Sequence, residues 1–406
     1  MSQNITRRNH YIPQFYLKNW SLDGKTIRTY SILVSNANVP YWTQQSIKNT
    51  AVWNDFYTRV VGNEELDDFE HWFDQEFERP AKPIFDKLIN DEKLSKEEIK
   101  ILSHFVFAQC FRTPAAYLRL TKQNLKIFPD AMNEVCGKLN KVSEHELQRS
   151  VSHQSANSKS IEDVLFPLKI SLDREKSIVE MKTIVGKGFY LHDLKHLLTS
   201  TVKVSERLNW QVVHAADGIS FPTSDDPVIC LNYNSERDYD FGGGWGKKHS
   251  NILMPISPKL LLFSEVGVKR KMSGLDYSLA YSKMFREMII RHAHRYVYAD
   301  RPQKGMLALN ARVVNRDIYE YGNVKKCAVG KHPKSEKHGN TAQFSEVERS
   351  GTQENCGGIE SGCLLRLHPL PVPRRRQPKR VACIDPDAVV VDKNIAKNDR
   401  FDLFSR

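Results

Sequence analysis

Five polar side chains in this sequence are of the types that acid–base chemistry on an anionic substrate requires. They lie in three separate stretches, as His10 with Gln14, then Arg112, then Asp225 with Asp226. An imidazole and a carboxylate can exchange protons with a reacting group, and a guanidinium can clamp a phosphate. If the three stretches meet, they predict a phosphodiester-cleaving site with His10 as acid or base, Arg112 as anion clamp and Asp225 as base or divalent-metal ligand.

The first stretch mixes polar residues with large aromatic ones. Pro13 suits the first position of a helix, and Tyr16 and Trp20 are about one turn apart, so we expect a short helix with apolar contacts. Residues 7–10 then precede the helix N-terminus, where free amides and nearby cations favour an anion. The N-terminal stretch is therefore predicted to belong to the folded body.

The second stretch ends a predicted helix. Ser95 and Glu98 have the spacing of a capping box, which satisfies backbone amides at the helix start. Gln109 and Arg112 are three residues apart and share a helix face, and Pro114 should kink the helix near Arg112. We expect this helix to present Arg112 to the site.

The third stretch, 224–227, reads Ser-Asp-Asp-Pro and has the composition of a turn at the end of a strand, which can project carboxylates. The loop that follows contains three consecutive glycines at 242–244. They lack the Lys-Ser/Thr of a phosphate-binding loop, so we assign them no ligand.

Each main candidate also has a structural interpretation. His10 would hydrogen-bond to backbone and fix the N-terminus, and Asp225 would cap its own turn. Arg112 would pair with Glu76 or Asp225 in a structural network. A shared, water-accessible pocket would favour the catalytic interpretation, whereas burial in paired groups would favour the structural one.

The spacing of apolar residues indicates an α+β fold in three parts. Residues 10–62 predict a short helix and then strands, and residues 64–200 predict a central helical segment, with one helix between 161 and 200. Residues 207–300 change to the two-residue period of strands and predict a mainly antiparallel strand region. Helices grouped between two strand regions are typical of an α+β domain.

The composition changes near Gly322. Residues 323–406 contain no Trp or Tyr, and the run 369–380 interleaves proline with basic residues, which neither a helix nor a central strand tolerates. We expect a single domain over residues 1–322 and a low-complexity, basic, disordered tail over 323–406.

The net charge of +12, of which roughly half lies in the tail, favours nucleic acid or another anionic ligand as partner. A solvated surface with surplus lysine is the simpler interpretation. No apolar run spans a bilayer, no signal-peptide segment is present, and the seven cysteines form no CxxC pair. We therefore expect a cytoplasmic protein with no membrane partner; its oligomeric state is left open.

Three motifs carry a family resemblance. Residues 9–20 read Asn-His-Tyr-Ile-Pro-Gln-Phe-Tyr-Leu-Lys-Asn-Trp, and residues 109–114 and 221–228 follow in order. Together they resemble the uncharacterised family called domain of unknown function 4238, in which Asn is common at the position of Asp226. The resemblance covers about residues 7–300 and implies no established activity; members are often encoded in bacterial and mobile-element genomes.

Two hypotheses follow. The first is a nucleic-acid-directed protein with a phosphodiester-cleaving site formed by His10, Gln14, Arg112, Asp225 and Asp226, with a divalent metal as candidate cofactor. The second is a non-enzymatic binding or scaffold protein of a defence or mobile-element module, whose motifs are structural.

Overall fold

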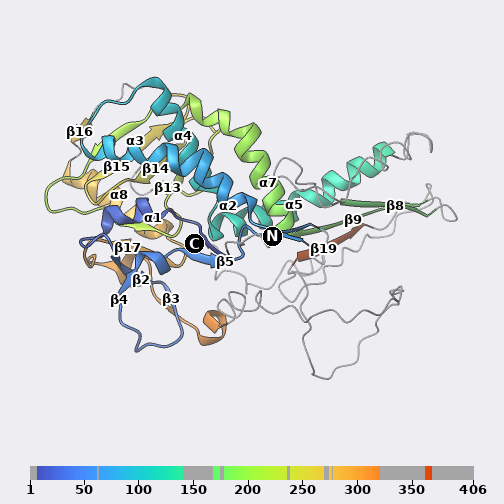
Figure 1. Ribbon diagram of the computed structural model, residues 1–406, viewed down its shortest axis with the longest axis horizontal. Coiled ribbons are helices and arrows are strands. Elements are labelled where there is room, and N and C mark those ends of the chain that lie inside the picture. The colour runs from blue at the N-terminus through green and yellow to red at the C-terminus, as the bar shows by residue number, and fades with distance from the viewer. Residues whose placement is uncertain are drawn as a thin grey trace.

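The computed structural model of the chain describes residues 7–61, 64–139, 168–173, 178–235, 238–268, 274–276, 278–320 and 362–367. Two sheets and a group of helices form the body, and one long helix with a narrow sheet extends from it to one side (Figure 1). Among the described residues, no helix combines the length and the apolar character needed to cross a bilayer.

The N-terminal part contributes two strands to a four-stranded sheet of order β11-β17-β2-β4. The carboxylate of Asp23 accepts the N–H groups of Lys25 and Thr26, which closes the turn before β2 at Gly24, where φ is +68°. The elements are α1 (Gln14–Leu17), β2 (Thr26–Ser31), β4 (Trp42–Ser46), β11 (Thr223–Ser224) and β17 (Tyr296–Ala299). Three two-stranded pairs flank them: β1 (Arg8–His10) with β5 (Val52–Asn54), β6 (Arg59–Val61) with β7 (Glu64–Leu66), and β3 (Leu33–Val34) with β18 (Val313–Val314).

The middle of the chain is helical as far as residue 139. The predicted capping box of Ser95 and Glu98 is present, with both reciprocal hydrogen bonds formed. Pro114 breaks the helix completely instead of kinking it, because proline cannot donate to the preceding turn and so begins a new helix. The helices are α2 (Asp68–Phe73), a π-helical turn (Asp74–Glu78), α3 (Arg79–Ile89), α4 (Lys96–Phe111) and α5 (Pro114–Leu139).

The prediction of a helix between 161 and 200 is correct only for the second half of that range. Strands β8 (Leu168–Asp173) and β9 (Ile178–Gly186) pair antiparallel within this range, and α7 (Lys187–His196) follows. Polar residues alternate with apolar ones throughout β8 and over residues 179–182 of β9, a two-residue period that the helical interpretation overlooked. Within the expected tail, strand β19 (Gly362–Leu367) pairs with β9; the rest of 323–406 lies outside the described residues, and the tail's disorder stays a prediction.

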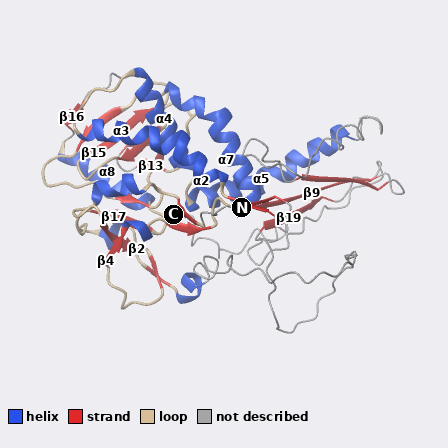
Figure 2. Cartoon of the chain, viewed as in Figure 1, coloured by secondary structure: helices blue, strands red, loops and turns tan. Residues whose placement is uncertain are grey.

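The C-terminal part forms a six-stranded sheet of order β13-β12-β14-β15-β10-β16, antiparallel except for the pair β10–β16. Residues 260–263, near the centre of this sheet, are apolar and buried, as the continuous apolar run in the sequence predicted. Its strands are β10 (Gln211–His214), β12 (Ile229–Ser235), β13 (Asp238–Asp240), β14 (Asn251–Pro255), β15 (Leu260–Glu265) and β16 (Gly274–Asp276). Helix α8 (Leu279–His292) leads from this sheet into β17 of the first sheet (Figure 2).

Buried aromatic side chains join the two sheets to the helices. The indole of Trp210, next to β10, donates to Ser103 of α4 at 2.8 Å, and Trp20 donates to the carbonyl of Phe221 at 2.7 Å. Both indoles are fully buried, so each donor needs such an acceptor. The predicted α+β class with a mainly antiparallel C-terminal region is confirmed; the single-domain boundary at 322 stays a prediction.

Candidate functional site

The position of His10 follows from the strand that contains it. Strand β1 pairs antiparallel with β5, and the N–H of Tyr11 extends this pairing to the carbonyl of Ala51 at 3.1 Å. Pro13 has no N–H to continue the ladder, and the chain turns into α1 directly after it. The side chains of His10 and Gln14 thereby reach the same pocket.

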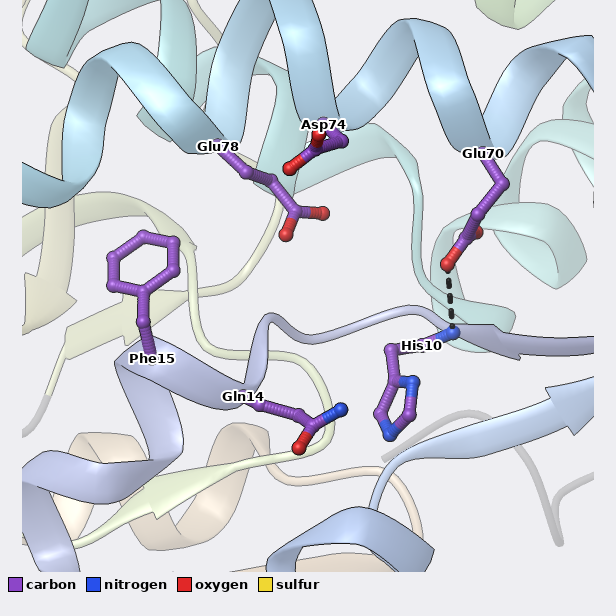
Figure 3. Close-up of a pocket in the computed structure, with 6 residues that line it drawn as sticks. All are labelled: His10, Gln14, Phe15, Glu70, Asp74 and Glu78. Atoms are coloured by element: carbon purple, nitrogen blue, oxygen red, sulfur yellow. Dashed lines mark hydrogen bonds between the residues drawn. The ribbon is translucent and has the colours of Figure 1, made fainter.

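The pocket, of about 290 Å³, lies between this N-terminal stretch and the continuous helix that runs from α2 into α3. Three carboxylates, spaced four residues apart on that helix, point towards His10 and Gln14 (Figure 3). A four-residue spacing keeps side chains on one helix face. The lining residues are His10, Gln14, Phe15, Glu70, Asp74 and Glu78.

Glu70 is the most perturbed group of this pocket. One carboxylate oxygen accepts the backbone N–H of His10 at 3.4 Å, and the side chain of Asn9 is a second donor. Burial disfavours the ionised form and raises the pKa of Glu70 from 4.5 to about 7, against the opposing effect of the nearby Arg112 guanidinium. Near neutral pH this carboxyl is protonated for a substantial part of the time.

The pKa of the His10 imidazole is shifted in the opposite direction to that of Glu70, which favours the neutral ring. Its Nε2 lies 3.2 Å from the carbonyl oxygen of Lys48, which can only accept, so Nε2 carries the proton and Nδ1 the lone pair. Burial lowers the pKa of His10 below its ordinary 6.5, and the charges of Arg8 and Arg112 act in the same direction. The exposed Arg8 guanidinium donates to the same Lys48 carbonyl at 3.3 Å, which places a cation beside the imidazole.

Arg112 lies behind the pocket, and its donors are already engaged. Its guanidinium is 1 % exposed, pairs with Glu78 at 2.6 Å, and donates to the carbonyls of His10 and Tyr11 at 2.9 and 3.2 Å. It also lies over the ring of Phe73, 4.7 Å from the centroid. Arg112 therefore holds the N-terminal stretch against the helix and offers little to an incoming anion.

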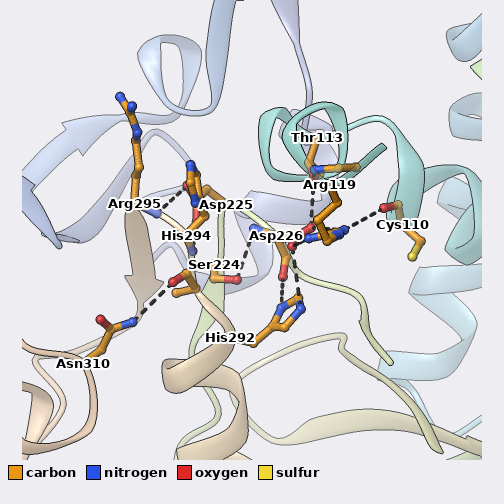
Figure 4. Close-up of polar contacts among 12 residues, drawn as sticks. Cys110, Thr113, Arg119, Ser224, Asp225, Asp226, His292, His294, Arg295 and Asn310 are labelled. Atoms are coloured by element: carbon orange, nitrogen blue, oxygen red, sulfur yellow. Dashed lines mark hydrogen bonds and ion pairs between the residues drawn. The ribbon is translucent and has the colours of Figure 1, made fainter. Parts of the chain in front are cut away.

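Asp225 and Asp226 are not among the residues that line this pocket. Figure 4 shows the contacts that they make instead. Asp225 is buried and accepts the backbone N–H groups of His294 and Arg295 at 3.0 and 2.8 Å. Burial, reinforced by the neighbouring Asp226 charge, raises the pKa of Asp225 to about 7 despite these hydrogen bonds. The side chain thus fixes the start of β17, and it does not cap its own turn.

Asp226 belongs to a second polar cluster with α5 and α8. It accepts from the Thr113 hydroxyl at 2.9 Å and forms a close ion pair with Arg119. The His292 ring lies on the other side, with Nε2 at 3.7 Å from the carboxylate. The Arg119 guanidinium stabilises the ionised form and keeps the pKa of Asp226 low although burial opposes it.

The structure thus brings together two of the three predicted stretches. His10 and Gln14 share the pocket, Arg112 contacts the backbone of His10, and Asp225 with Asp226 forms a separate buried cluster. The catalytic roles assigned to these five residues stay predictions.

Sequence reasoning missed the carboxylates of the pocket. It proposed Glu76 or Asp225 as the partner of Arg112, whereas Glu78 is the partner. Residues 70, 74 and 78 share a helix face, and Glu76 is exposed on another. The acidic spacing of four along an aromatic helix was the available signal.

The described residues contain no group of three or more His, Cys, Asp or Glu side chains arranged to hold a metal ion.

Fold and pocket together define an α+β protein with a carboxylate-rich polar pocket at its N-terminal motif. Residues 8–303 match the family described as Protein of unknown function (DUF4238). This chain belongs to that family, as its three motifs indicated. Comparison with curated proteins found no match, and neither did comparison with solved structures.

Proposed function

We propose that this protein cleaves the phosphodiester bonds of RNA by acid–base chemistry, with His10 as base and Glu70 as acid. The observation that carries the proposal is the pairing, in one pocket, of an imidazole with a lowered pKa and a carboxyl whose pKa is raised to about 7. Such opposite displacements assign the base and the acid of a proton-transfer pair.

RNA carries its own nucleophile, which suits a site of this kind. His10 Nδ1 takes the proton of a 2′-hydroxyl as that oxygen attacks phosphorus, and Glu70 gives its proton to the departing 5′-oxygen. Proton transfers of this kind contribute about 10² to 10⁴ in rate. DNA lacks the 2′-hydroxyl and would need an activated water instead.

Anion binding in this proposal falls to Arg8, because Arg112 is engaged by Glu78. The Arg8 guanidinium is exposed and fixed beside the imidazole through the shared Lys48 carbonyl. It attracts a phosphate towards the His10 imidazole, in line with the positive net charge of the chain. Gln14 orients the substrate, while Arg112, Asp225 and Asp226 act as positioning residues; we place the reaction in the cytoplasm.

A non-enzymatic binding or scaffold protein of a defence or mobile-element module is the second candidate. One observation favours it: three carboxylates line the pocket, and such a lining attracts a cationic group and repels phosphate. Burial of Arg112, Asp225 and Asp226 in paired contacts supports the same interpretation.

The test uses a 5′-labelled RNA oligonucleotide, the same sequence as DNA, and an RNA with one 2′-deoxy position, all in EDTA. We expect the RNA to be cleaved, the DNA to stay intact, and the chimera to resist only at its 2′-deoxy position. His10→Ala should lower the rate at least about 100-fold. His71→Ala, an exposed histidine on α2, is the matched control and should leave it unchanged. Intact RNA, or equal rates for His10→Ala and wild type, would refute the proposal. If the RNA stays intact and the protein binds a polyamine, and if Glu70→Gln weakens that binding, the second candidate is supported.

A further inference from the structure

Phe15 gives the pocket an aromatic wall. Its ring centroid lies 5.5 Å from that of Phe85, at an interplanar angle of 82°, and 5.7 Å from that of Phe105. Both partners are fully buried, so the core holds the Phe15 ring in place, while Phe15 itself is only partly buried and lines the pocket. A fixed aromatic ring in a polar pocket is a typical contact for an unstacked nucleobase.

Glu78 supplies hydrogen-bond acceptors in the same part of the pocket. Arg112 pairs with one carboxylate oxygen, Oε1, at 2.6 Å, and the Glu78 side chain is still 22 % exposed. Figure 3 shows the carboxylate directed into the pocket, on the same side of His10 as Phe15. An ionised carboxylate accepts hydrogen bonds and donates none, so this part of the pocket favours a ligand with N–H donors and repels phosphate.

The two ends of the pocket therefore differ in chemistry. Glu70, which accepts the backbone N–H of His10, lies roughly two helical turns from Glu78. Figure 3 shows His10 between Glu70 on one side and Phe15 with Glu78 on the other. In the reaction proposed above, His10 takes the proton of the 2′-hydroxyl and Glu70 protonates the departing 5′-oxygen. The ribose that carries this hydroxyl, together with its base, then extends from His10 towards Phe15.

We propose that Phe15 and Glu78 form a subsite for guanine, so that the RNA is cut on the 3′ side of guanosine. The guanine belongs to the nucleotide whose 2′-hydroxyl attacks. This inference rests on the proposed function and adds its substrate specificity. The pocket volume of about 290 Å³ is close to the lower limit of about 300 Å³ for ligand sites, which suits a single nucleobase.

Guanine fits the Glu78 carboxylate better than the other bases do. Its Watson–Crick edge presents two adjacent donors, N1–H and the exocyclic N2 amino group, to the acceptor. Adenine and cytosine present one amino donor beside a ring nitrogen that only accepts, and uracil presents one N–H between two carbonyl groups. An accepting ring nitrogen or carbonyl next to the carboxylate would be repelled, so the negative charge that excludes phosphate selects guanine.

Binding of free nucleosides tests the subsite separately from cleavage, because a nucleoside holds no phosphodiester. In calorimetric titrations we expect guanosine to bind at least about tenfold more tightly than adenosine, with inosine, which lacks the N2 amino group, in between. Phe15→Leu should weaken guanosine binding about tenfold. Glu78→Gln, which keeps an oxygen acceptor for Arg112, should abolish the preference for guanosine over adenosine. Glu76→Gln, exposed on another face of the same helical segment, is the control and should bind guanosine as wild type does.

Cleavage of RNA oligonucleotides that differ only in one base is the second measurement. Wild type should cut after a single guanosine at least about tenfold faster than after adenosine at the same position. Circular dichroism confirms that each variant is folded, and if Glu78→Gln is not, wild-type selectivity and Phe15→Leu decide. Equal affinities for guanosine and adenosine would overturn the guanine subsite even where RNA is cleaved. Guanosine-selective binding together with intact RNA would refute the cleavage proposal and support the subsite.

Discussion

Replacing Glu70 with Gln should change how the stability of the protein depends on pH. The pKa of Glu70 is raised from 4.5 to about 7 by burial, and each pH unit is worth about 1.4 kcal/mol. The neutral carboxyl thus favours the folded state fully below about pH 4.5, and this contribution is lost as pH rises through 7. The ionised carboxylate then costs the folded state about 3 kcal/mol relative to the protonated one.

Glutamine keeps the shape of the side chain and cannot ionise. The free energy of unfolding of Glu70→Gln, relative to wild type, should therefore rise by about 2 kcal/mol between about pH 5 and about pH 8. Urea unfolding at constant ionic strength, followed by tryptophan fluorescence, measures it. Glu76→Gln, exposed on the same helical segment, is the control and should stay flat within about 0.5 kcal/mol. A Glu70→Gln difference that does not change with pH, or that falls as pH rises, would refute the assignment of a buried, protonated carboxyl.

Three further substitutions test the structure. Arg112→Met should cost about 3–5 kcal/mol of unfolding free energy in the same urea assay, because it leaves a partly buried carboxylate and two carbonyls without their donor; a loss under about 1 kcal/mol would contradict that role. Gly243→Ala should cost about 1–3 kcal/mol, since the new Cβ meets the Leu231 backbone, whereas Gly244→Ala has room and should cost less; equal losses would argue against the close approach of the loop. Ser95→Ala should lower stability by about 1 kcal/mol through loss of the α4 cap, and an unchanged urea midpoint would show that the cap contributes nothing.

Local sequence signals were sufficient for most elements of the fold. The capping box at Ser95, the two-residue period of 208–212 and the continuous apolar run at 260–263 depend on neighbouring residues, so they could be read directly. Residues 168–173 and 178–186 were misassigned because the sequence between the two strands has no strong turn motif and β9 directly precedes α7. The pairing of β2 with β17 joins distant segments, which no local pattern reveals.

The candidate site was predictable only in part for the same reason. His10 and Gln14 belong to one short segment around Pro13, so their shared pocket follows from local geometry. Glu70 takes its character from burial against that segment, and burial depends on the tertiary fold. The engagement of Arg112 by Glu78 likewise depends on how two helices pack. Residue type alone therefore suggested an anion clamp where the fold has a structural ion pair.

The most direct test of the account is the rate of RNA cleavage as a function of pH for wild type, His10→Ala and Glu70→Gln. We predict that the wild-type rate is greatest at mildly acidic pH, above the pKa of His10 and below the value of about 7 for Glu70. The Glu70→Gln variant should be slower and should lose the decline on the alkaline side. A wild-type rate that keeps rising through neutral pH, or an alkaline decline that survives in Glu70→Gln, would contradict a protonated Glu70 as the acid.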